Sequence, residues 1–187
     1  YSIGGVLSKQ EALLEDYAFL IDTLLYAYRV NYDKKYLKLA TKLSKESLGI
    51  FYKNNFWYLD KNLMARANFK DKYYTSALSK MFDNLITISN YTFDLKLLHK
   101  TKNMIKNYSN QILSDIPNNS AGVSNIIRMQ RGDVILKANK ENLKKYYKNI
   151  INIKYPFLFT KYENEKDFLA CDESTCFSYS KSFDKIK

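Results

Sequence analysis

The sequence predicts a mainly α fold, built from helical hairpins and followed by a small α/β appendage. Two segments carry this prediction, because residues 13–47 and 74–109 repeat one pattern: an apolar helix, an Asn/Tyr/Asp turn and a more basic helix. Asp33 in the first copy aligns with Asp94 in the second, at a constant offset of 61 residues. Repeated hairpins are typical of stacked or ring-like helical architectures, in which no single unit can bury its apolar face alone.

The first hairpin begins with a helix predicted from residue 8 to about residue 30. Ser8 and Glu11 have the spacing of a capping box. Apolar residues then cover most of the circumference, which is typical of a helix buried on several sides. The next helix is predicted from Asp33, as its N-cap, to near Lys53, with one apolar stripe and Lys on the opposite face. We therefore expect an inner helix followed by an outer helix in each hairpin.

A short strand after a turn is predicted at 54–60, between the two hairpins. The second hairpin is expected to begin near Thr75 or Ser76, and its outer helix is capped by Asp94. Pro117 ends this outer helix, and a third inner helix is predicted to reach about Arg131.

The residue pattern changes at Gly132, from long helices to shorter predicted elements. We expect a strand at 134–137, an amphipathic helix at 140–150 and a second strand at 153–162, whose Pro156 indicates an edge position. The segment 167–170 is a candidate third strand. The sequence therefore predicts two parts: helical hairpins over 1–131, and a small α/β appendage with a Cys-x4-Cys tail over 132–187.

The net charge of +11 raises the question of an anionic partner. The cations are nearly all Lys, spread along the chain without a basic block, and the chain has few Arg, the residue favoured for phosphate and base recognition. We therefore expect solvated Lys on outer helices and no nucleic-acid partner. No segment approaches 18 uncharged apolar residues, and the start lacks a signal-peptide pattern. The sequence thus predicts a cytoplasmic protein with no membrane partner.

Three groups of residues, in order along the chain, resemble one known family. They are 14–20 with Leu24, Leu25, Tyr32, Asp33, Tyr36 and Leu37; Asp71 with Ser76, Ser79, Asn84 and Leu85; and the tail 170–176 with its Cys-x4-Cys spacing. Together they resemble the C-terminal part of the thioredoxin-domain-containing, spermatogenesis-associated-type proteins. The resemblance covers nearly the whole chain, although residues 74–79 lack the Gly and Asn of the family's pattern.

The resemblance implies a parent protein with a thioredoxin-like domain and a large (α/α)6 toroid, similar to N-acylglucosamine 2-epimerases and six-hairpin glycosidases. The chain, which begins at Tyr1, is then expected to be a C-terminal piece carrying a partial toroid. Its partners would be the rest of the parent chain, a carbohydrate and, through exposed inner-helix faces, further copies of itself. Sugar processing or sugar binding is one expected function. The alternative is a structural or protein-interaction module that supports the thioredoxin-like domain and has no catalysis of its own.

Candidate site residues for sugar chemistry come from the starts of the inner helices. Glu15 and Asp16 could act as acid and base, although adjacent helical residues point about 100° apart, and capping is the alternative role. Tyr17 and Trp57 could stack on a sugar, with core packing as the alternative. The set of candidates comprises Glu15 and Asp16 as catalytic residues, and Tyr17, Trp57, Asp71, Ser76 and Ser79 as substrate-binding residues.

Cys171 and Cys176 are the only cysteines. The four residues between them differ from thioredoxin-type Cys-x2-Cys spacing, and two thiolates supply only half of a zinc site. Free thiols are favoured in a cytoplasmic protein, with a disulfide or a metal as alternatives, and we expect a structural role. His99 is the only histidine, and no Gly-rich phosphate loop is present. The sequence therefore predicts neither a metal nor a cofactor.

Overall fold

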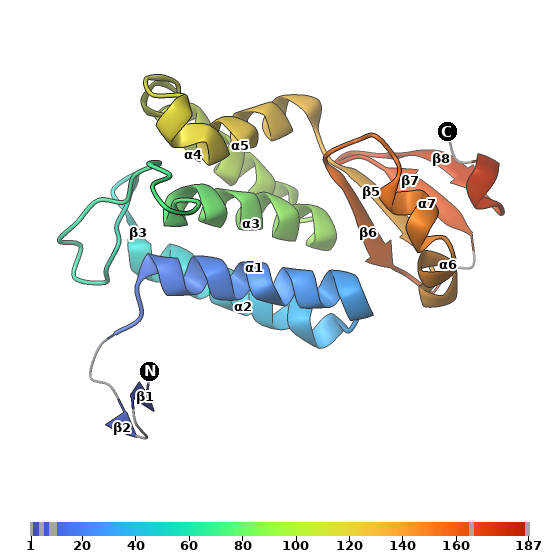
Figure 1. Cartoon of the computed structure of the whole chain (residues 1–187), viewed down its shortest axis with the longest axis horizontal. Helices are drawn as coiled ribbons and strands as arrows, with labels where there is room; N and C mark the ends of the chain where they lie inside the picture. The colour runs from blue at the N-terminus through green and yellow to red at the C-terminus, as the bar shows by residue number, and fades with distance from the viewer. Residues whose placement is uncertain (1, 4–5, 8–10, 165–166, 186–187) are drawn as a thin grey trace.

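The computed structural model describes residues 2–3, 6–7, 11–164 and 167–185 (Figure 1). The helices are α1 (Leu14–Asn31), α2 (Lys34–Phe51), α3 (Ala77–Thr92), α4 (Leu95–Leu113), α5 (Ser120–Arg131), α6 (Lys140–Lys145) and α7 (Tyr147–Ile151), with 3-10 turns at Pro117–Asn119 and Phe183–Lys185. The strands are β1 (Ser2–Ile3), β2 (Val6–Leu7), β3 (Tyr52–Lys53), β4 (Phe56–Trp57), β5 (Val134–Ala138), β6 (Leu158–Tyr162), β7 (Phe168–Cys171) and β8 (Cys176–Ser180).

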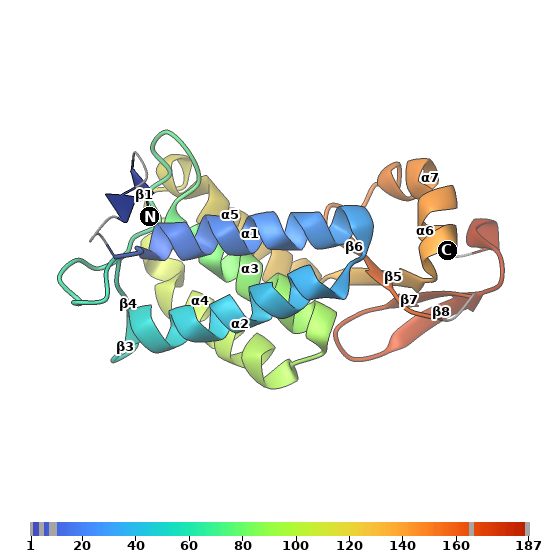
Figure 2. The ribbon, with the colours of Figure 1, turned by 90° about the horizontal axis from the view of Figure 1, so that it is seen from below.

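The repeat predicted from the sequence is present as two helical hairpins, α1–α2 and α3–α4, with α1 beside α3 (Figure 2). Tyr32 and Phe93 occupy the same place in the two turns and share a left-handed backbone conformation. Asp33 and Asp94 then cap α2 and α4, each accepting a hydrogen bond from a backbone amide of the first turn. The repeated sequence pattern therefore encodes a repeated turn.

Helix α1 begins later than predicted. The capping box at Ser8 lies outside the described residues, and the N-cap of α1 is Leu13. Because Leu13 has no polar side chain, the carboxylate of Asp16 accepts a hydrogen bond from its backbone amide, at 2.7 Å. Asp16 thus stabilises the start of the helix, both as a hydrogen-bond acceptor and as a negative charge near the positive end of the helix dipole.

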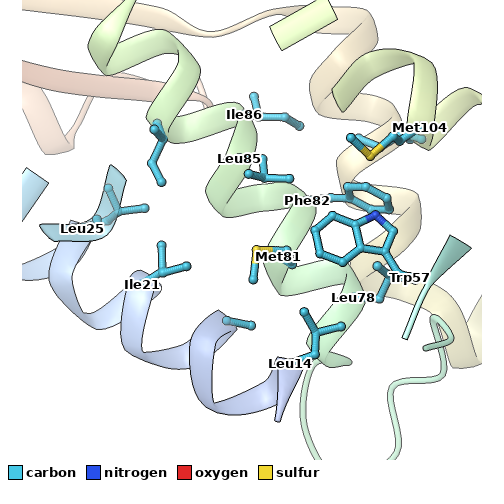
Figure 3. Packing of buried hydrophobic residues seen from close by; sticks show 14 of the residues in the cluster. Leu14, Ile21, Leu25, Trp57, Leu78, Met81, Phe82, Leu85, Ile86 and Met104 are labelled. Carbon is cyan, nitrogen blue, oxygen red and sulfur yellow. The ribbon is translucent and has the colours of Figure 1, made fainter. Parts of the chain in front are cut away.

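Helix α3 is the centre of the helical core (Figure 3). Met81, Phe82 and Leu85 are fully buried between α1 and the outer helices, and Trp57 packs edge-on against Phe82, with ring centres 6.0 Å apart. Helices α2 and α4 bury only one stripe each, and α3 is buried on nearly all sides, so the predicted alternation of inner and outer helices is confirmed for the second hairpin. Helix α1 also buries a single stripe and exposes Leu20, Tyr26 and Val30, so its predicted burial on several sides is wrong.

The sheet has strand order β6-β5-β7-β8, with β5 and β6 parallel and the other pairs antiparallel. Leu136 and Ala138 of β5 face α6 and α7 and form a second apolar cluster with Leu143 and Ile150. On the edge strand β6, Phe159 packs against the helical core instead. The sheet is therefore covered on one face by the short helices and joined to the long helices through the other.

The predicted fold class, a mainly α partial toroid, is wrong. The chain has an α/β fold, in which the long helices pack with a mixed four-stranded sheet and a small antiparallel pair, β3–β4. The helical repeat dominates the sequence pattern, whereas the strands are short and lack regular alternation. Strand β8 was not predicted, the expected helix at 140–150 is divided at Tyr146, and Pro156 lies in a turn before β6. The edge position of β6 is confirmed.

Candidate functional site

The predicted catalytic carboxylates lie in the first turn of α1, where each has a hydrogen-bond partner within the chain. Glu15 accepts a hydrogen bond from the Tyr74 hydroxyl at 2.6 Å, and Asp16 caps the helix through Leu13. Tyr17 packs edge-on against Phe51, with ring centres 5.4 Å apart. These contacts fit capping and packing, the alternative roles that the sequence left open.

Asp71, Ser76 and Ser79 come together at the start of α3. The Asp71 carboxylate accepts hydrogen bonds from the backbone amides of Ser76 and Ala121, both at 2.8 Å, and so joins the starts of α3 and α5. The Ser76 hydroxyl accepts from the Ser79 amide at 3.2 Å as the N-cap of α3. Trp57, in contrast, is fully buried in the core. None of the seven predicted site residues lines either of the two clefts described next.

Both clefts flank the edge strand β6, where it meets the turn between α1 and α2. The first, the tyrosine groove, has a volume of about 550 Å³ and is lined mainly by apolar and aromatic side chains that include Tyr26, Tyr32 and Tyr147. The second, the lysine cleft, has a volume of about 540 Å³. Its principal residues are Lys34, Lys38, Thr41, Lys161, Tyr162 and Glu163.

Two elements place the ammonium groups of the lysine cleft. Lys34 and Lys38 lie one turn apart on α2, so they share a helix face, and the Asp33 cap fixes where that helix begins. Lys161 comes from β6, and its ammonium group lies 3.4 Å from the Glu163 carboxylate. Lys34 also lies over the Tyr162 ring, 5.3 Å from its centre. Residues more than 120 positions apart thus form one cationic surface.

The electrostatics of the cleft favour an anion. Partial burial lowers the pKa of Lys161; Glu163 opposes this shift, while the ammonium groups of Lys137 and Lys34 add to it. Among the described lining residues, Glu163 is the single acid facing three lysines, and it is shared with Lys137 at 3.9 Å. An anionic ligand would relieve the repulsion between these lysines.

A buried ion-pair centre holds β6 in place beside the cleft. The Arg128 side chain donates to Asp133 through Nε at 2.8 Å and to Asp83 at 2.5 Å. Burial opposes the charge on Arg128, but the two carboxylates outweigh this effect and raise its pKa. The guanidinium also lies over the Phe159 ring of β6, 4.6 Å from its centre. Sequence analysis missed this centre, for which an Arg among many lysines was the only signal.

Cys171 and Cys176 form a disulfide, so the expectation of free thiols is wrong. The two residues are adjacent across the β7–β8 hairpin, a proximity that the sequence spacing allowed but did not favour. His99 is exposed on the outer helix α4. In the described part of the chain, no group of three or more His, Cys, Asp or Glu side chains is placed to hold a metal ion.

The fold and its clefts define an α/β protein with a basic, aromatic junction between helices and sheet. Comparison with protein-family models gives no match, and a search of curated proteins finds no related sequence. The resemblance to the thioredoxin-domain-containing family stays a prediction. Among the described helices, none is both long and apolar enough to cross a membrane.

Proposed function

We propose that this chain is a binding module for a small anionic ligand, which occupies the lysine cleft, and that the chain has no catalytic activity of its own. The observation that carries the proposal is the convergence of Lys34, Lys38 and Lys161 on one cleft whose only described acidic residue is Glu163. Charge-assisted hydrogen bonds from ammonium groups to phosphate or carboxylate oxygens are among the stronger polar contacts in proteins.

The other lining groups support a ligand of sugar size with one acidic group. The hydroxyls of Thr41 and Thr92 donate to backbone carbonyls of their own helices and keep oxygen lone pairs that can accept hydrogen bonds from sugar hydroxyls. A volume of about 540 Å³ lies within the range of small-molecule sites. A phosphorylated or carboxylated sugar combines these requirements, and it agrees with the carbohydrate partner expected from the family resemblance. The absence of catalysis is proposed because Glu15 and Asp16 lie outside this cleft. The cytoplasmic location stays a prediction.

The proposal can be tested by calorimetric titration of the purified chain with glucose 6-phosphate, glucose and inorganic phosphate. We expect glucose 6-phosphate to bind and glucose not to bind, because the phosphate supplies the charge that the lysines attract. Lys161→Met and Lys34→Met should each weaken binding about tenfold, which corresponds to about 1.4 kcal/mol. Lys45→Met is the matched control, because Lys45 is exposed on α2, outside the cleft, and its loss changes the net charge equally.

Equal affinity for glucose and glucose 6-phosphate, or unchanged binding in both cleft variants, would contradict the proposal. If none of the three compounds binds, the protein-interaction module becomes the better description of the chain. If inorganic phosphate binds as tightly as glucose 6-phosphate, the cleft is an anion site and the sugar contributes nothing to its affinity.

Stability measurements can separate lost binding from lost folding in the Lys161 variant. Burial lowers the pKa of Lys161 below its unfolded value, so the folded chain holds this proton less tightly than the unfolded chain. Protonated Lys161 therefore lowers the free energy of unfolding. The chain is more stable at a pH above the unfolded pKa of Lys161, and this extra stability is lost as the pH falls through the folded pKa. We expect Lys161→Met to be at least as stable as the parent at neutral pH in urea unfolding, with the difference shrinking as the pH rises toward about 10. A destabilised variant at neutral pH would contradict this expectation.

A further inference from the structure

The two sulfurs of the disulfide differ in their access to solvent. Cys171 ends β7 and is 1% exposed, whereas Cys176 begins β8 and is an exposed residue. The turn between them is held by Asp172, whose carboxylate accepts hydrogen bonds from the backbone amides of Ser174 and Thr175, both at 2.7 Å. An incoming thiolate can therefore reach Cys176 more readily than Cys171.

A buried lysine lies against the exposed cysteine. The Lys137 side chain on β5 is 10% exposed, and its Nζ lies 3.9 Å from the Cys176 Sγ. The carboxylate paired with this ammonium group is Glu163, at the long distance of 3.9 Å, and Glu163 is also shared with Lys161 at 3.4 Å. The Phe93 ring, whose centre is 4.1 Å from Nζ, adds a cation–π contact. A buried charge is costly without a close counter-charge, and a neutral disulfide sulfur does not supply one.

We propose that Cys171–Cys176 is a thiol–disulfide exchange site, in which Lys137 stabilises the thiolate form of Cys176. Reduction would place a negative charge beside the buried Lys137 ammonium group and complete an ion pair that the disulfide leaves incomplete. Cationic neighbours are what favour thiolates in reactive cysteines. This inference does not depend on a ligand in the lysine cleft, and it replaces the purely structural role predicted from the cysteine spacing.

The exchange partner is a dithiol, and the step conserves atoms and electrons. One thiolate of the dithiol attacks the Cys176 Sγ, which forms a mixed disulfide and releases Cys171 as a thiolate that takes up a proton. The second thiol of the partner, as a thiolate, then attacks the partner's own sulfur in the mixed disulfide and releases the Cys176 thiolate beside Lys137. The partner leaves as a disulfide, and two electrons have passed to the protein.

The remaining charges near the turn are already paired or fixed. Glu173 accepts hydrogen bonds from the Lys102 ammonium group at 2.5 and 2.6 Å. Hydrogen bonds from the turn amides of Thr175 and Ser174 lower the pKa of Asp172, so its carboxylate stays charged and opposes the thiolate to some extent. Lys137 is thus the cation that directly faces the Cys176 sulfur, and it can be changed alone.

The test is the equilibrium of the full chain with mixtures of reduced and oxidised dithiothreitol at neutral pH. We expect Lys137→Met to shift this equilibrium toward the disulfide by about tenfold, equivalent to about 30 mV, and Lys137→Arg to restore most of the parent value. Lys181→Met serves as the control, because Lys181 is exposed just after β8 and its loss removes the same charge. Equal equilibria for the parent and Lys137→Met would overturn the proposal.

A second measurement covers the case in which Lys137→Met fails to fold. In Cys171→Ser, Cys176 is a free thiol, and we expect iodoacetamide to alkylate it several times faster at neutral pH than it alkylates cysteine in an unstructured peptide. Alkylation at the peptide rate or slower would show that Lys137 does not stabilise the thiolate, and the disulfide would then have a structural role only.

Discussion

Replacing Asp133 with alanine should lower the free energy of unfolding by about 3–5 kcal/mol, because it removes one partner of a buried ion pair. Arg128 is only 3% exposed, and it loses two of its hydrogen bonds in this variant. Asn90, which donates to the same carboxylate at 2.6 Å, loses its partner as well. Urea unfolding followed by circular dichroism measures the loss directly.

An exposed pair provides the matched control. Lys42 and Glu46 lie one turn apart on α2, with 3.8 Å between their charged atoms, and Glu46→Ala should cost less than about 1 kcal/mol. The double variant Arg128→Met, Asp133→Leu should be more stable than Asp133→Ala, because the one charge that it leaves without its partner, Asp83, has a side chain 38% exposed to water. A loss below about 1 kcal/mol in Asp133→Ala would mean that Asp83 alone can satisfy Arg128.

This ion-pair centre links the helices to the sheet. Arg128 comes from α5, Asp83 and Asn90 come from α3, Asp133 lies just before β5, and Phe159 belongs to β6. The boundary predicted after residue 131 falls between Arg128 and Asp133. A change in the residue pattern of a sequence therefore marks where the type of secondary structure changes, but strong contacts can still join the two segments on either side.

The hairpins were predictable because their signals are local. An Asp at each turn supplies a cap, and each outer helix carries one apolar stripe that packs on the inner helices. These features repeat along the chain, so one copy supports the other. The same repetition misled the prediction of fold class, because it outweighed the short strands that build the sheet.

The antiparallel half of the sheet and the cleft could not be predicted, because both depend on pairings that no local pattern indicates. Strand β8 pairs with β7 only through the hairpin that the disulfide closes. The parallel pairing of β5 with β6 through α6 and α7, in contrast, agrees with the strand–helix–strand pattern of residues 134–162. Lys34 and Lys161 meet only after this packing. In a chain so rich in Lys, no local pattern distinguishes the lysines of the cleft from those that face solvent.

The predicted sugar-site residues raise a different difficulty. Asp71, Ser76 and Asp16 stand at helix starts, where short polar side chains satisfy free backbone amides. Carbohydrate sites use the same residue types for the same ability to accept and donate hydrogen bonds. Sequence alone therefore cannot separate a cap from a ligand contact at such a position, whereas the structure shows capping contacts for all three side chains.

Trp57 gives the second large effect that we expect. It is fully buried, where it packs against Phe82 and Tyr52, and Trp57→Ala should cost about 3–5 kcal/mol through the cavity that it leaves. Circular dichroism in urea is the appropriate measurement, because the variant lacks the only tryptophan of the chain.

Trp57→Phe separates the contribution of packing from that of the indole N–H. The indole nitrogen is buried without a hydrogen-bond partner among the described residues, so phenylalanine removes an unsatisfied donor while keeping an aromatic ring in the core. We expect it to cost less than half as much as alanine. If Trp57 instead stacked on a sugar, as the sequence suggested, both variants would lose ligand affinity at nearly unchanged stability. Its position in the core favours the opposite result: reduced stability, with glucose 6-phosphate binding retained wherever the variant remains folded.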